Sequence, residues 1–239
     1  MIEIDDLTVR FGGVTSLDGV TVRLERPLCG LIGPNGAGKT TFFNVLSGFV
    51  TPASGSIRAF GSDLLALPHF RRARWGLRRT FQTEQAIESL SIFDNVAMVW
   101  EHTTSGRAGR DEDVLRAIAF VGIRRDPHAK VGALDAHERR LVELARAVVG
   151  KPRVVLLDEP AAGLPDEETE QMGQVIRAIP TDIGAMVILA DHDMNLVSGV
   201  CEETMVLDFG QVITSGPTAD VLRDERVVSA YLGGEAVTS

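Results

Sequence analysis

A glycine-rich octapeptide offers the clearest chemistry in this sequence. Residues 33–40 read GPNGAGKT, which matches the pattern G-x-x-x-x-G-K-[ST]. Glycines let the backbone wrap closely around a polyphosphate, so that N–H groups point inward at its oxygens, and a following helix adds its positive end. Lys39 can bring a positive charge to the β and γ phosphates, and the Thr40 hydroxyl can bind Mg²⁺. The pattern therefore predicts a loop that binds a nucleoside triphosphate.

Two acids at the end of an apolar run supply a second piece of chemistry. Val154–Leu157 is apolar, and Asp158 and Glu159 follow it directly. At the carboxyl end of a strand, Asp158 could hold the water shell of Mg²⁺ and Glu159 could polarise an attacking water. A strand that ends in Asp-Glu is often only a solvated terminus. Downstream of a phosphate loop, however, it indicates the acid pair that a P-loop ATPase needs.

These residues need a sheet to position them. Leu28–Ile32, Val154–Leu157 and Met186–Ala190 are short apolar runs separated by helical patterns, which predict crossover units and a parallel sheet. Ile2–Val9 and Val20–Leu24 instead alternate apolar and polar residues, as half-buried antiparallel strands do. The chain is therefore predicted to combine a parallel α/β core with a smaller antiparallel part.

Two further segments have local signals. Thr204–Leu207 and Gln211–Thr214 flank Asp208-Phe209-Gly210 and predict a hairpin; this tripeptide also occurs in kinases, but no kinase glycine loop accompanies it. The middle, about Thr83–Gly150, is predicted to be helical. Its last helix is expected to start at a capping box of Asp135 and Glu138 and to stop at Gly150, before Pro152. Surface loop is expected at Thr103–Gly109 and a loose tail at Glu235–Ser239.

Composition narrows the class of protein. The 239 residues carry 24 basic and 33 acidic side chains, and this net charge of −9 argues against binding nucleic acid through the overall field. The N-terminus has no apolar signal core, and no run approaches a membrane span. Cys29 and Cys201 are expected to be reduced core residues of a cytoplasmic protein. One basic cluster comprises Arg71, Arg72, Arg74, Arg78 and Arg79; a solvated face is the default interpretation, and contact with a membrane subunit or lipid headgroups is the alternative.

Together these features resemble the ATP-binding subunit of ABC transporters, over nearly the whole chain. Phe11 sits where the family places an aromatic that stacks on adenine, although a core aromatic is the alternative. Gln82 matches the glutamine loop, which touches Mg²⁺ and faces the membrane subunits. His192 matches the switch histidine that contacts the γ phosphate, and Ala161–Leu164 matches the segment that crosses the dimer interface.

The resemblance implies a set of site residues and two cofactors, ATP and Mg²⁺. The implied catalytic residues are Glu159, His192 and Gln82, and the implied metal ligands are Thr40, Gln82 and Asp158. The residues implied to hold the nucleotide are Phe11, Gly33, Pro34, Asn35, Gly36, Ala37, Gly38, Lys39, Thr40 and Thr41.

Within the family, the chain looks most like the ATPases of branched-chain amino-acid uptake systems. The stretches that carry this likeness are RFGGV (10–14), RTFQ (79–82), EPAAGL (159–164), HDM (192–194) and YLG (231–233). Urea and amide importers share much of the pattern, so they remain an alternative.

The sequence departs from the family at its signature. Where the family has Leu-Ser-Gly-Gly-Gln, this chain has Leu134-Asp135-Ala136-His137-Glu138. In family dimers the serine and glycines of one chain bind the γ phosphate held by the other, and Asp135 would bring a negative charge there. Pro165 and Asp166 also follow Leu164 where the family usually has Asn or Asp first. These changes put a symmetric homodimeric ATPase in doubt.

We therefore expect an α/β P-loop NTPase of the ABC ATPase type, with an antiparallel β subdomain and an inserted helical subdomain. Residues 1–239 form a single ABC ATPase domain, in which 1–82 and 151–239 make the nucleotide-binding core and 83–150 the helical subdomain. The resemblance implies an ATP-hydrolysing importer subunit on the inner face of the cell membrane. Its implied partners are integral membrane permease subunits, a second ATPase subunit and, indirectly, a solute-binding protein, with no nucleic acid. The rivals are a regulatory subunit that hydrolyses little ATP and a soluble ABC ATPase acting on DNA or ribosomes.

Overall fold

The computed structural model describes residues 1–104 and 108–232. The predicted tail therefore lies outside the described residues, as do residues 105–107 of the predicted loop. The chain divides into two compact units: Met1–Arg72 with Ile188–Ser239, and Ala73–Val187. Helix α2 (His69–Trp75) and strand β8 (Met186–Ala190) both cross from one unit to the other.

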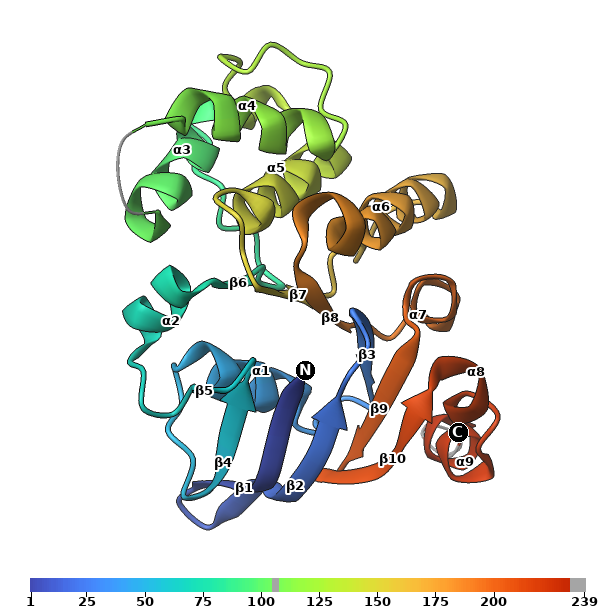
Figure 1. The fold of residues 1–239 in the computed structure, drawn as a ribbon. Helices are drawn as coiled ribbons and strands as arrows, with labels where there is room; N and C mark the ends of the chain where they lie inside the picture. Colours follow the sequence, from blue (N-terminus) through green and yellow to red (C-terminus); the bar gives the residue numbers. More distant parts are fainter. Residues whose placement is uncertain (105–107, 233–239) are drawn as a thin grey trace. The chain divides into compact units, whose positions relative to one another are not determined.

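The first unit contains a four-stranded antiparallel sheet. Its strands are β1 (Ile2–Phe11), β2 (Val14–Leu24), β4 (Ser54–Ala59) and β5 (Ser62–Asp63), in the order β2-β1-β4-β5 (Figure 1). The register places Ile2 opposite Leu24 and Ile4 opposite Val22, and all four side chains are buried. The alternating pattern thus correctly predicted β1 and part of β2, because every second residue of such a strand faces the core, whereas β4 and β5 were not predicted.

A parallel pair of strands lies in the same unit. Strand β3 (Leu28–Ile32) is buried at every residue and pairs with β9 (Glu203–Asp208), while β9 and β10 (Gln211–Pro217) form the predicted hairpin. The helices of this unit are α1 (Lys39–Ser47), α7 (Met194–Val200), α8 (Thr218–Val221) and α9 (Glu225–Leu232). Cys29 and Cys201 are buried free thiols, as predicted. Burial and the nearby carboxylate of Asp191 raise the pKa of Cys201 to about 12.

The second unit holds the predicted helical segment and a second parallel pair. The prediction was wrong for residues 83–91, which form no helix. Strand β6 (Leu77–Arg79) pairs with β7 (Val154–Asp158), whose five residues are all buried. Its helical elements are α3 (Ile92–Thr103), α4 (Arg110–Phe120), η1 (Val131–Ala133), α5 (Ala136–Val148), α6 (Asp166–Ala178) and η2 (Ile179–Ile183), the last being a π-helix. No helix in the described parts of the chain is long and apolar enough to cross a membrane.

The capping box at the start of α5 forms as predicted. The Asp135 carboxylate accepts from the Glu138 N–H at 2.8 Å, and the Glu138 carboxylate accepts from the Asp135 N–H at 3.3 Å. Leu141, Leu144, Ala145 and Val148 are buried along one face, as their spacing required. Helix α5 therefore has a firmly defined first turn.

The basic cluster is not one solvated face. Arg71 and Arg74 are exposed, but Arg72 and Arg78 are buried. The Arg72 guanidinium donates to the carbonyls of Val45 and Leu46, and the Arg78 guanidinium donates to that of Ala73. Burial lowers the pKa of Arg78 to about 10. The default interpretation was wrong for the buried members, because these guanidinium groups satisfy backbone carbonyls inside the fold.

Candidate functional site

The glycine-rich loop joins β3 to α1 in the first unit. Gly33, Gly36 and Gly38 all have positive φ, at 154°, 82° and 107°. A Cβ added to Gly33 would lie 2.1 Å from the Leu207 carbonyl oxygen, so no larger residue fits there. Gly38 caps α1 and offers no side-chain hydrogen bond to the first turn. No side-chain cap therefore competes with an anion for the N–H groups of that turn.

Lys39 and the two threonines lie at the start of α1. The Lys39 ammonium donates to the Gly33 carbonyl at 2.5 Å and to that of Pro34 at 3.1 Å, so it folds back over the loop. Thr40 is exposed. The Thr41 hydroxyl lies 2.8 Å from the Ser16 hydroxyl on β2. Ser16 is a supporting residue that the sequence analysis missed, because it lies far from the loop in sequence.

The turn between β9 and β10 braces the same loop. The Gly210 N–H donates to the Ala37 carbonyl at 3.0 Å, and the Gly210 carbonyl accepts from the Asp18 N–H at 2.9 Å. A Cβ on Gly210 would lie 2.6 Å from the Ser16 carbonyl oxygen, so only glycine permits this approach. The tripeptide is thus a hairpin turn, as predicted, and it also supports the phosphate loop.

Phe11 and His192 belong to this unit as well. Phe11 ends β1 and is 52% exposed, so it is not a core aromatic. His192 follows β8, and its side chain is 62% exposed. The buried Asp191 carboxylate accepts from the N–H groups of His192 and Asp193, at 2.8 and 3.0 Å. This turn fixes the backbone of His192 while its ring remains accessible.

The last residue of β6 and the segment that follows this strand hold the two acids of the second unit. The Asp158 carboxylate pairs with the Arg79 guanidinium at 2.9 Å, with both side chains largely buried. The Glu159 carboxylate accepts from the Gln82 side-chain amide at 3.2 Å, and Glu159 has an unusual positive φ of 49°. Two predicted site residues, Gln82 and Glu159, are therefore in direct contact. The pairing of Arg79 with Asp158 could not be predicted from the basic cluster or from the RTFQ stretch, because it depends on β6 lying beside β7.

The oxygen donors predicted for Mg²⁺ suit that ion chemically. A threonine hydroxyl, a carboxylate and an amide oxygen are hard ligands, and Mg²⁺ usually completes its shell with water and nucleotide phosphates. Across residues 1–104 and 108–232, no group of three or more His, Cys, Asp or Glu side chains could hold a metal by itself. Each of these side chains is therefore a donor of the type that Mg²⁺ accepts, Thr40 in the first unit and Asp158 in the second.

The altered signature forms the first turn of α5. Asp135 and Glu138 cap each other, and the Glu138 carboxylate also accepts from the Arg125 guanidinium at 2.7 Å. The carboxylates of this turn are therefore engaged with backbone and with Arg125. Ala136 and His137 occupy the positions where the family signature has glycines.

Comparison with known proteins decides the family. The ABC transporter family model matches residues 17–162. The chain belongs to the ABC transporter family. A second model, for branched-chain amino acid ATP-binding cassette transporters, matches residues 211–237 of this ABC protein. The expected family, and with it the ATPase class, are confirmed.

Full-length relatives of this ABC protein include two transport ATP-binding proteins. It is 32% identical over 250 residues to the high-affinity branched-chain amino acid transport ATP-binding protein BraF of Pseudomonas aeruginosa, covering 98% of both chains. It is also 32% identical, with the same coverage, to LivG of Escherichia coli K12, which has the same description.

Solved structures confirm the fold class. The ADP conformation of an ATP-binding cassette of an ABC transporter matches with a TM-score of 0.86 and 23% identity, over 98% of each chain. A dimeric cassette bound to ADP and Pi matches with a TM-score of 0.80 and 20% identity, over 91% of this chain and 99% of that one. At these identities the likeness establishes the ABC ATPase fold alone.

Proposed function

We propose that this ABC ATPase binds MgATP and hydrolyses it to drive a membrane importer of branched-chain or related hydrophobic amino acids. The observation that carries the proposal is the 32% identity to BraF and LivG across 98% of the chain. The match to the branched-chain model at residues 211–237 supports the same solute class independently of the phosphate loop. A urea or amide importer is the alternative for the solute.

The loop supplies the binding chemistry. Gly36 and Gly38 present backbone N–H groups, and Lys39 must exchange its two carbonyl partners for phosphate oxygens. Pro34, Asn35, Ala37 and Thr41 complete the loop and its anchor. The exposed ring of Phe11 is the proposed stacking surface for adenine.

The remaining predicted residues supply the hydrolytic chemistry. Thr40 and Asp158 are the proposed Mg²⁺ ligands, together with Gln82. When bound, Mg²⁺ would neutralise phosphate charge. Glu159 orients and deprotonates the water, and Gln82 holds the Glu159 carboxylate in place. The accessible ring of His192 is the proposed γ-phosphate contact.

Partners and location follow from the same proposal. Integral membrane permease subunits carry the solute path, a solute-binding protein delivers to them, and the ATPase acts on the inner face of the membrane. A second ATPase subunit, identical or different, completes the nucleotide sites. The division into a core of 1–82 and 151–239 and a helical subdomain of 83–150 remains a prediction within this scheme.

A regulatory subunit with little hydrolysis of its own is a second candidate, favoured by the altered signature. Its first turn carries the Asp135 carboxylate where the family has a serine. Reconstitution with candidate permease and binding-protein subunits in vesicles separates the two. The proposal expects uptake of leucine or isoleucine that requires ATP and is lost in Glu159→Gln. Uptake that persists in Glu159→Gln would favour the regulatory role, and uptake of urea alone would overturn the solute class.

A further inference from the structure

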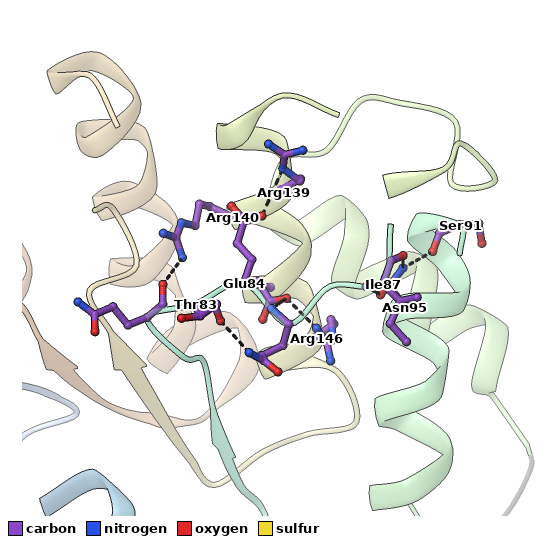
Figure 2. Close-up of polar contacts among 11 residues, drawn as sticks. Thr83, Glu84, Ile87, Ser91, Asn95, Arg139, Arg140 and Arg146 are labelled. Atoms are coloured by element: carbon purple, nitrogen blue, oxygen red, sulfur yellow. Dashed lines mark hydrogen bonds and ion pairs between the residues drawn. The ribbon is translucent and has the colours of Figure 1, made fainter. Parts of the chain in front are cut away.

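Side chains of α5 bind the segment of residues 82–85, which carries Gln82. Arg140 donates to the Gln82 carbonyl at 3.4 Å, and Arg139 pairs with Glu84 at 3.3 Å (Figure 2). One turn further along α5, the Glu143 carboxylate accepts from the Gln85 N–H at 3.1 Å. Three side chains of one helix thus hold three nearby residues of a segment that has no helix or strand of its own.

Glu143 is the most deeply placed member of this group. Its side chain is 7% exposed, and the oxygen that accepts from Gln85 also accepts from Arg146 at 2.7 Å. A buried carboxylate is costly to desolvate unless it is paired and hydrogen-bonded, and Glu143 is both. Arg146 therefore neutralises the charge, which leaves Glu143 able to hold the Gln85 backbone.

The far end of the segment is pinned independently. Asn95 on α3 is fully buried, and its amide oxygen accepts from the Ile87 N–H at 2.8 Å. The Asn95 amide group also donates to the carbonyls of Ile87 and Ser91. With Gln85 held by α5 and Ile87 held by α3, the backbone between them has little freedom to move on its own.

We infer that Glu143 is a positioning residue for hydrolysis, acting through Gln85 and Gln82 on Glu159. The inference rests on the proposed function. The Gln82 amide contacts the Glu159 carboxylate, so any displacement of Gln82 withdraws that hydrogen bond. Because α5 holds Gln82 through Arg140 and Gln85 through Glu143, a shift of α5 shifts this amide. Helix α5 also begins at the altered signature. A movement of that first turn would therefore reach the hydrogen bond between Gln82 and Glu159 through α5.

Amide hydrogen exchange tests the hydrogen bond from the Gln85 N–H to Glu143 and does not require the protein to be active. In peptides covering residues 83–90, the Gln85 amide should be protected in the parent chain. It should lose protection in Glu143→Ala and keep it in Glu143→Gln, whose amide oxygen can still accept. Glu112→Ala, which removes an exposed ion pair on α4, is the control and should change nothing. Unchanged protection in Glu143→Ala would overturn the inference whatever the chain hydrolyses.

Hydrolysis kinetics test the positioning role. Glu143→Ala should lower kcat about tenfold, the equivalent of one lost hydrogen bond, and leave the KM for ATP unchanged. Glu143→Gln should recover most of the rate. The double variant Gln82→Ala with Glu143→Ala should be no slower than Gln82→Ala alone, because both act on the same contact. If Glu143→Ala does not fold, Arg140→Ala replaces it in this cycle.

Each contrary kinetic result has one meaning. A full multiplicative loss in the double variant, or an unchanged kcat once Gln85 has lost protection, would overturn the role of Glu143. A parent chain that hydrolyses no ATP in any assembly would overturn the proposed function, and the positioning role with it. The exchange experiment would still report whether Glu143 holds the Gln85 N–H.

Discussion

The Arg79 guanidinium lies 2.9 Å from the Asp158 carboxylate, and the two side chains are only 5% and 11% exposed. This pair joins the ends of β6 and β7. Next to it, the Asp158 N–H donates to the Thr80 hydroxyl at 3.1 Å. Arg79 also lies over the Phe81 ring, with its guanidinium carbon 4.9 Å from the ring centroid. The acid proposed to bind Mg²⁺ is therefore already neutralised and oriented by the protein.

Removing Arg79 should destabilise the chain strongly. Arg79→Met leaves a buried carboxylate without this partner, and breaking such a pair typically costs about 3–5 kcal/mol of unfolding free energy. Urea denaturation measures the loss. Arg116→Met removes an exposed pair with Glu112 and should cost far less. If Arg79→Met were as stable as Arg116→Met, the pair would not support β7.

Lys39 should govern nucleotide affinity. In Lys39→Ala the phosphates lose their nearest cation, so the affinity for MgATP should fall by at least about tenfold, as expected when a charge-assisted hydrogen bond is lost. Calorimetric titration of the two chains measures this. Lys130→Ala removes an exposed lysine outside the loop and should bind normally. If Lys39→Ala bound MgATP as tightly as the parent chain, the assignment of residues 33–40 as the phosphate-binding loop would be wrong.

The features that could be predicted from sequence are local. The apolar run Leu28–Ile32, the glycines after it and the Asp135–Glu138 capping box each depend on neighbouring residues, so composition and spacing reveal them. The supports of the site are different. Ser16 on β2 meets Thr41 on α1, and Gly210 meets Ala37, only because elements far apart in the chain pack together in the fold.

The basic cluster shows why burial is hard to predict. Five arginines within nine positions indicate a hydrated surface, yet Arg72 and Arg78 are buried against backbone carbonyls. A guanidinium group carries five donors, so it can enter a fold wherever carbonyl oxygens at the end of a helix can accept a further hydrogen bond. Which carbonyls those are depends on tertiary structure, and the sequence does not display it.

Phe209 should be a stabilising target. It is 87% exposed and has a φ of 42° in the turn between β9 and β10, a conformation that asparagine followed by glycine favours. Phe209→Asn should raise the unfolding free energy by part of the roughly 1–2 kcal/mol that a left-handed residue costs, since little apolar burial is lost. Thermal denaturation provides the measurement. Phe209→Ala, which removes the ring without the turn preference, should not stabilise, and an equal gain in both variants would refute this explanation.

The signature should limit the activity of a homodimer. At about 4 Å and an effective dielectric of 20, the Asp135 carboxylate of one subunit and a γ phosphate held by the other would repel by roughly 4 kcal/mol. If solvent and Mg²⁺ reduced this repulsion to about 1–2 kcal/mol, the equilibrium constant for dimer closure would still fall about tenfold. The isolated chain should therefore hydrolyse ATP weakly, and a second, different ATPase with an intact signature should raise the rate. The combined Asp135→Ser, Ala136→Gly and His137→Gly change should also raise it.

The role of Asp135 as the N-cap of α5 provides a control for the prediction on activity. Serine caps a helix as well as aspartate does, so Asp135→Ser alone should keep the stability of α5, whereas Asp135→Ala should cost about 1 kcal/mol. Phosphate release by the purified chains measures activity. A vigorous parent homodimer that these changes do not improve would show that Asp135 only caps its own helix.

Glu159→Gln should separate ATP binding from ATP hydrolysis. The substitution keeps the size of the side chain and its position beside Gln82 but removes the base, so ATP binding should persist while turnover falls by a factor of about 10² or more. The decisive measurement is the rate of ATP hydrolysis in the assembled complex, with sedimentation to detect the ATP-bound dimer that should accumulate. We expect a trapped dimer with almost no hydrolysis. Hydrolysis at the parental rate would contradict this expectation.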